Sequence, residues 1–140
     1  PMEDQLKAQA TANVIFHGEA ENMDAFWPKV GLLIMPSRFE GLPMAALEAM
    51  SHGAVVLAYR VGSLDKLITA DNGFLVPARD FSGLNSALSA YLRSGNARRK
   101  RMSKQARKTI TARFSARAVL PKVLDVYRES IPAKLPRKLR

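Results

Sequence analysis

A loop at residues 36–43 has the residue types of an anion site. Gly41 lets the backbone approach a ligand closely. A helix beginning near Leu42 would point its free N–H groups and the positive end of its dipole at the same place. The amides of Gly41, Leu42 and Met44 could bind a phosphate there, whereas Pro43 has no N–H to donate. The loop therefore has the chemistry of a phosphate cradle.

Two glutamates, Glu40 and Glu48, flank this cradle. Ionised carboxylates only accept hydrogen bonds, so they bind vicinal hydroxyls well and phosphates badly, and a nucleotide sugar offers both groups. A glutamate before a helix is also favourable for the dipole alone, and one within a helix is usually solvated. However, Glu48 stands among Leu47, Ala49 and Met50, in a helix with little polar surface. A carboxylate buried there needs a ligand or a dedicated partner.

Short apolar runs alternate with helical spacing along the chain and would position these loops. This alternation predicts an α/β fold, a Rossmann-like parallel sheet with helices on both faces, whose ligands lie beyond the carboxyl ends of the strands. The expected strands are residues 13–17, 31–35, 55–59 and 73–77, and the expected helical segments are residues 24–30, 43–52, 65–68, 80–92 and 98–114.

A last helix is predicted from Ser115, which can cap it, with Val119, Val123 and Tyr127 facing inward. Pro121 predicts that this helix starts late or kinks. The pattern then ends, so we expect one domain over residues 1–130 followed by a loose basic tail over residues 131–140.

The formal charge of +10 is unevenly distributed. Residues 1–92 hold 6 Lys/Arg and 10 Asp/Glu, whereas residues 93–140 hold 16 and 2. The basic segment, densest over residues 98–101, fits a solvated helix face, an anionic membrane surface or a nucleic acid. No aromatic residues interleave with these cations, which argues against nucleic acid. Anionic lipid is therefore the favoured functional interpretation.

The composition excludes several kinds of site. The 140 residues include no cysteine, which rules out disulfides, iron–sulfur clusters and thiolate zinc sites. His17 and His52 are the only histidines, too few for a histidine-rich metal centre. The apolar runs are too short to span a bilayer and no export signal is visible, so we expect a cytoplasmic protein, soluble or peripheral at the inner membrane.

Residues 13–114 resemble the C-terminal, nucleotide-sugar-binding half of retaining GT-B glycosyltransferases of family 4, also called glycosyl transferases group 1. A chance pair of glutamates eight residues apart would mean little, but here the pair lies within the ordered surrounding pattern. The matching stretches are Val-Ile-Phe-His-Gly at 14–18, Pro-Ser-x-x-Glu-Gly-x-Pro at 36–43, Leu-Glu-Ala-Met-Ser-His-Gly at 47–53, Val-Val at 55–56, Gly-Phe-Leu-Val-Pro at 73–77 and Phe-Ser at 114–115.

The resemblance implies a role for each matching residue. Glu40 would be the catalytic residue, contacting the transferred sugar, and Glu48 would bind the ribose hydroxyls. The amides after Glu40 would receive the diphosphate, and the loop at residues 18–19 would border the base. Arg38 could pair with Glu40 or contact a phosphate. The donor-binding residues expected in this way are Glu48, Gly41, Leu42, Met44, Ser37, Arg38, Gly18 and Glu19.

The resemblance also implies a reaction. It would retain the anomeric configuration through an oxocarbenium-like state, with no metal and no cofactor. The expected partners are a nucleotide-sugar donor and a saccharide or lipid-linked acceptor held by a separate N-terminal domain, in bacterial polysaccharide or lipopolysaccharide biosynthesis. Two other interpretations stay open: a non-catalytic binding or assembly module that kept the fold, and a basic domain that binds anionic lipid or nucleic acid.

The sequence departs from the family pattern at several places. The family has two strands and an Arg-Lys pair that grips the diphosphate ahead of the first matching stretch, but the cations of residues 1–35 are Lys7 and Lys29 alone. Lys66 stands where relatives often have glutamate, and Ala54 replaces a common proline. We therefore expect the isolated chain to be catalytically inactive.

The missing strands would also affect the sheet. In the strand order 3-2-1-4-5-6, residues 13–17 would form the third strand and residues 31–35 the fourth, separated by the two absent strands. Residues 31–35 would then expose an apolar edge. We expect either a homodimer that covers this edge or a rearranged sheet in which the two strands pair directly.

Overall fold

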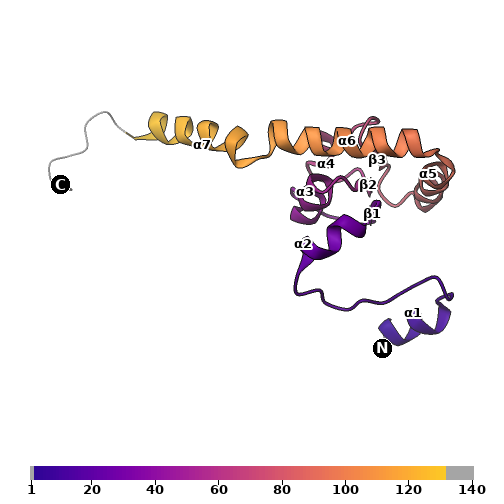
Figure 1. Cartoon of the computed structure of the whole chain (residues 1–140). Helices are drawn as coiled ribbons and strands as arrows, with labels where there is room; N and C mark the ends of the chain where they lie inside the picture. Colours follow the sequence, from indigo (N-terminus) through magenta and orange to yellow (C-terminus); the bar gives the residue numbers. More distant parts are fainter. Residues whose placement is uncertain (1, 132–140) are drawn as a thin grey trace.

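A computed structural model describes residues 2–131 (Figure 1). Its core is a parallel sheet of three strands in the order β1-β2-β3. The elements along the chain are α1 (Met2–Gln9), α2 (Met23–Phe26), the 3-10 helix η1 (Trp27–Lys29), β1 (Leu32–Met35), α3 (Met44–Ser51), β2 (Val55–Tyr59), α4 (Leu64–Leu67), β3 (Gly73–Val76), α5 (Phe81–Arg93), α6 (Asn96–Arg113) and α7 (Ala116–Ser130).

The central strand β2 is buried at all five positions, as its continuous apolar run predicts. Leu32 of β1 pairs with Val55, and Val56 pairs with Gly73 of β3. The strands predicted at residues 31–35, 55–59 and 73–77 are therefore confirmed to within a residue. Their order is that of the last three strands of the expected fold.

Helices cover both faces of the sheet, which confirms the predicted fold class. Val56 and Ala58 point to one face, where they pack with buried residues of α3, α4 and α6. Leu57 and Tyr59 point to the other face, against Leu84 of α5. Burying a valine or leucine side chain such as Val56, Leu57 or Leu84 contributes about 1.5–3 kcal/mol, so β2 and its covering helices form the stable part of the molecule.

The buried Asn72 ties the loop before β3 to this core. Its side-chain oxygen accepts a hydrogen bond from the Thr69 N–H at 2.8 Å, and its amide nitrogen donates to the Leu67 carbonyl at 3.2 Å and to the Thr109 hydroxyl at 3.1 Å. Because these bonds join α4, the loop and α6, they fix the loop at residues 69–72 in place.

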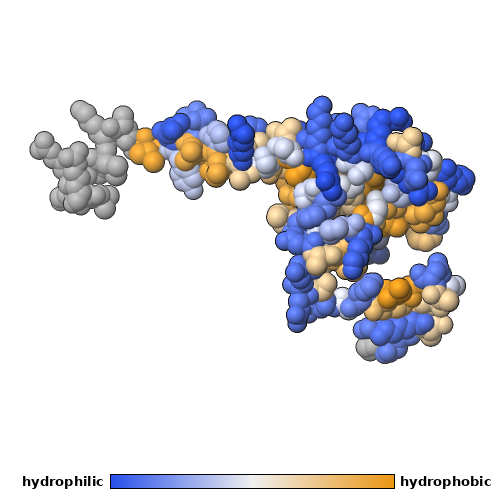
Figure 2. All heavy atoms as spheres, in the orientation of Figure 1, coloured by the Kyte–Doolittle hydropathy of each residue, from blue (hydrophilic) through white to orange (hydrophobic). Residues whose placement is uncertain are grey.

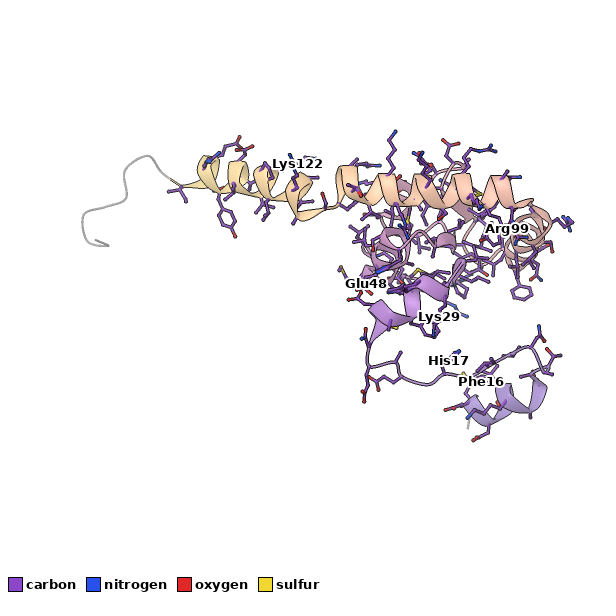
Figure 3. All side chains as sticks on the ribbon, viewed as in Figure 1. Phe16, His17, Lys29, Glu48, Arg99 and Lys122 are labelled. Atoms are coloured by element: carbon purple, nitrogen blue, oxygen red, sulfur yellow. The ribbon has the colours of Figure 1, made fainter. Side chains whose placement is uncertain are left out.

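The strand predicted at residues 13–17 is wrong. These residues form no strand and are exposed, with 73% of Ile15 in contact with solvent. Phe16 and His17 lie beside α1, away from the sheet (Figure 3). A strand needs a neighbour for its backbone hydrogen bonds, and the segment has none in the part of the chain that the structure describes. The rearranged sheet, in which residues 13–17 pair with β1, is accordingly not found there.

The C-terminal helices are confirmed in extent but only partly in packing. Ser115 caps α7 by accepting a hydrogen bond from the Ala118 N–H at 3.3 Å, and the helix does not start late, since it runs through Pro121 from Ala116. The prediction that Val119, Val123 and Tyr127 face inward is wrong: their exposed fractions are 37%, 41% and 63%. The helix extends away from the sheet, so no other element among residues 2–131 covers its apolar side (Figures 1 and 2).

The predicted domain and tail are only partly described, because residue 1 and residues 132–140 lie outside the described part of the chain. Within residues 2–131, no helix is both long enough and apolar enough to cross a membrane. The basic helix α6 packs Met102 and Ala106 against the core, and hydrophilic residues cover its outer side (Figure 2).

Candidate functional site: the loop between β1 and α3

The loop predicted to bind phosphate lies where expected, after the carboxyl end of β1 and before α3. Pro43 is the N-cap of α3 rather than its first helical residue, and its carbonyl accepts hydrogen bonds from the Ala46 and Leu47 amides. The Met44 and Ala45 amides precede the first intrahelical bonds, so they are free to donate to a ligand. The positive end of the α3 dipole points the same way.

The loop is held in place by the segment that follows β2. The Ser63 N–H donates to the Gly41 carbonyl at 2.9 Å. Gly62 has a φ of +56°, and a Cβ at this position would lie 1.8 Å from the Glu40 carbonyl oxygen. Only glycine allows so close a contact between two loops. Gly62 therefore positions Glu40 and Gly41, a role that the sequence analysis did not assign to it.

An open hollow of about 660 Å³ lies beside this contact. It brings together three of the predicted residues, Arg38, Glu40 and Gly41. No Arg38–Glu40 ion pair forms within residues 2–131, which leaves Arg38 free to contact a phosphate. The remaining lining residues are Phe39, Val61 and Gly62. A side-chain carboxylate, a guanidinium and a glycine backbone thus face the same space.

Glu48 lies deeper along α3 and does not line the hollow. It is half-buried, and its Oε2 accepts a hydrogen bond from the Trp27 indole N–H at 3.4 Å. Trp27 belongs to η1 and is only 4% exposed. The partner that a carboxylate in this position needs is therefore Trp27, a contact that no sequence pattern indicates. Figure 3 shows Glu48 beside η1, where Lys29 is labelled.

The other predicted site residues are more dispersed. Ser37 is half-buried but does not line the hollow, and neither do Leu42 and Met44, whose side chains are 39% and 64% exposed. Gly18 and Glu19 lie in the exposed segment before α2 and are also absent from its lining. The structure thus assembles the centre of the predicted site and leaves the predicted base-binding loop apart from it.

No cluster of three potential metal ligands occurs within the described residues. His52, at the end of α3, is held by structural contacts. Its carbonyl accepts a hydrogen bond from the Arg107 guanidinium at 2.7 Å, and its Nδ1 lies 3.1 Å from the Glu48 carbonyl. The Arg107 bond links the end of α3 to α6, and the Nδ1 contact lies within the last turn of α3, the helix that contains Glu48.

The family assignment comes from comparison with known proteins. A sequence profile described as "Glycosyl transferases group 1" matches residues 1–94, more than half of the chain. The chain belongs to the glycosyl transferases group 1 family. A curated relative, the lipopolysaccharide core biosynthesis mannosyltransferase LpsB of Rhizobium meliloti, is 30% identical over 89 residues, which are 61% of this chain and 25% of LpsB.

Two solved structures superimpose closely on the chain. Sucrose-phosphate synthase of Thermosynechococcus elongatus matches with a TM-score of 0.83 and 26% identity, over 95% of this chain and 34% of that protein. HepE of Anabaena, solved in complex with UDP, matches with a TM-score of 0.81 and 18% identity, over 91% of this chain and 36% of HepE. The predicted resemblance to part of a GT-B glycosyltransferase is confirmed, and the chain spans about a quarter to a third of these relatives.

Proposed function

We propose that this chain is the donor-binding part of a glycosyltransferase and that the loop at residues 36–43 receives the diphosphate of a nucleotide sugar. The observation that carries the proposal is the loop contact itself. Gly62 holds Glu40 and Gly41 at the rim of an open hollow, next to the free amides at the start of α3. Family membership and the UDP complex of the related HepE support the same assignment.

Each group in the proposed site has a distinct task. The Gly41, Leu42 and Met44 amides and Arg38 would stabilise negative charge on the diphosphate as the sugar leaves, an effect of preorganised donors. Glu40 would contact the sugar, and Glu48 would turn from Trp27 toward the ribose hydroxyls. The carboxylates would position the donor rather than act as the acid and base of a glycosidase. Ser37, Gly18 and Glu19 remain predicted donor contacts, and no metal or cofactor enters the scheme.

The proposed parent reaction transfers the sugar with retention to a saccharide or lipid-linked acceptor, in bacterial polysaccharide or lipopolysaccharide biosynthesis, as the name of the relative LpsB suggests. The acceptor would bind to a separate N-terminal domain, as the family resemblance implies. The cations of residues 1–35 are Lys7 and Lys29, so the Arg-Lys pair that the family resemblance leads us to expect at the diphosphate has no counterpart there. We therefore expect nucleotide binding without turnover from the chain alone.

Calorimetric titration with UDP, GDP and ADP tests this proposal. We expect weak binding of at least one nucleotide, abolished by Glu48→Ala and by Glu48→Gln. The glutamine keeps an acceptor for the Trp27 indole, and Trp27 is the only tryptophan, so its emission reports whether the fold persists. Glu21→Ala, an exposed carboxylate outside the site, is the matched control. If nucleotide affinity is unchanged in both Glu48 variants and decreases as the salt concentration rises, the nucleotide is bound by nonspecific charge attraction instead.

The same protein would attach to the cytoplasmic surface of an anionic membrane through α6. This helix carries 8 Lys/Arg and no acidic residue, and none of its cations forms an ion pair within residues 2–131. Juxtaposed cations contribute about 1 kcal/mol each at such a surface. Co-sedimentation with anionic vesicles, lost in neutral vesicles and at high salt, is the expected result. Equal binding to both kinds of vesicle would refute lipid attachment.

A non-catalytic binding or assembly module remains the second candidate. It is favoured by Lys66, a lysine where the family resemblance leads us to expect a glutamate. In that case the chain would bind no nucleotide, and Lys66→Glu would not create binding.

A further inference from the structure

The free edge of β3 lies outside the proposed donor site. In the described residues, β3 pairs with β2 alone. The Arg60 N–H donates to the Val76 carbonyl at 2.8 Å, so the polar groups of Val76 face β2. Because backbone groups alternate along a strand, the N–H and C=O of Leu75 point away from β2. Such unpaired groups form a template for a further strand.

One hollow runs along this edge, and a second, between the loop before β3 and α6, adjoins it at Ala70 and Arg98. The first, of about 500 Å³, is lined by β3 itself, by Ala87 of α5, by residues 68–70, and by Arg60 and Arg98. The second, of about 550 Å³, continues past Ala70 to Arg101. Arg60 bonds to the residue that ends β3, whereas Ala70 and Arg98 lie toward its beginning. Because Arg60 and Arg98 both line the first hollow, a cation lies near each end of β3.

The cations at the start of α6 are electrostatically unbalanced. The first two turns of α6 carry four consecutive cations at residues 98–101, and the N-cap of the helix, Gly95, provides no side-chain acceptor. Positive charge at the positive end of a helix dipole is unfavourable. Arg99 is engaged internally, since its guanidinium lies 5.2 Å from the Tyr91 ring, where α5 meets α6 (Figure 3). Arg98 and Arg101 form no ion pair within residues 2–131, although Asp71 lines the second hollow with them.

We propose that the β3 edge binds an extended, acidic peptide segment of a partner protein. The segment would add to the sheet beside β3, pairing with the Leu75 backbone, and would place carboxylates near Arg60 at one end and near Arg98 and Arg101 at the other. Backbone pairing gives affinity and the charged ends give selectivity, as in other cases of strand addition. The wall at residues 69–72 is already fixed by Asn72, so the groove needs little rearrangement.

A fluorescently labelled nonapeptide tests this proposal. Its sequence alternates valine and threonine and has a pair of glutamates at each end. The full chain is titrated into the peptide, and binding is measured by fluorescence anisotropy. Arg98→Glu should weaken binding by about tenfold or more. Lys104→Glu, the same charge change on an exposed residue outside both hollows, should weaken it by less than about threefold. Arg98→Glu also places an acid in the first turn of α6, so its thermal midpoint should rise. Lost binding in that variant would therefore not reflect unfolding.

A second peptide separates strand addition from simple charge attraction. N-methylation of alternate residues removes backbone donors and keeps every charge, so it should abolish binding. Equal binding of the methylated peptide, or equal losses with Arg98→Glu and Lys104→Glu, would overturn the proposal in favour of a nonspecific polyanion surface. Because neither arm involves nucleotide, the result is independent of the donor site.

Discussion

A single residue, Gly62, determines where the backbone of Glu40 and Gly41 lies in the candidate site. Gly62→Ala would place a Cβ 1.8 Å from the Glu40 carbonyl oxygen and would hold a non-glycine residue at a φ of +56°. We expect a loss of about 1–3 kcal/mol in the free energy of unfolding, measured with urea, together with weaker nucleotide binding. Gly41→Ala is the control for stability, since a Cβ there meets nothing within 4 Å. Equal stability of the two variants would refute the role of Gly62.

The position of a site residue could be predicted from the sequence where it depends only on residues nearby in the chain. Arg38, Glu40 and Gly41 follow one another in a loop, so their shared hollow follows from the loop itself. Trp27 and Gly62 act on residues distant in sequence, and a tryptophan or glycine has no pattern that indicates such a contact. Gly18 and Glu19 were assigned through the resemblance alone, and the segment that would bring them to the site does not pair with the sheet.

Secondary-structure elements could be predicted where the signal lies within the element itself. Continuous apolar runs give β1 to β3, and capping residues give the starts of α5 and α7. Residues 13–17 have the same kind of composition, but strand formation also requires a pairing partner. The periodicity of α7 likewise indicates an apolar face without indicating what covers it.

The exposure of α7 leads to a prediction at this scale. Val123→Ala should change the free energy of unfolding of the sheet region by less than about 0.5 kcal/mol, because Val123 packs against no core element. Met50→Ala, in the fully buried part of α3, should cost about 2–5 kcal/mol. Urea titration followed by Trp27 emission compares the two variants. A loss of similar size in Val123→Ala would show that α7 is covered in solution.

At the scale of the whole molecule, the exposed edge of β1 favours association of two chains. Ile34 of β1 is 39% exposed, and β1 pairs with β2 alone in the described residues. Apolar strand edges associate readily, so we expect this chain to form a homodimer. Light scattering after size exclusion should give twice the 15.4 kDa of the chain. A single monomeric species over the whole concentration range would refute the dimer.

The most direct measurement for the central claim is a crystal structure of this chain soaked with UDP or GDP. The proposed function predicts the diphosphate against the amides of Gly41 and Met44, at the N-terminus of α3, with Glu48 turned from Trp27 toward the ribose hydroxyls. A nucleotide bound elsewhere, or a cradle left empty at saturating nucleotide with Glu48 still bonded to Trp27, would contradict it.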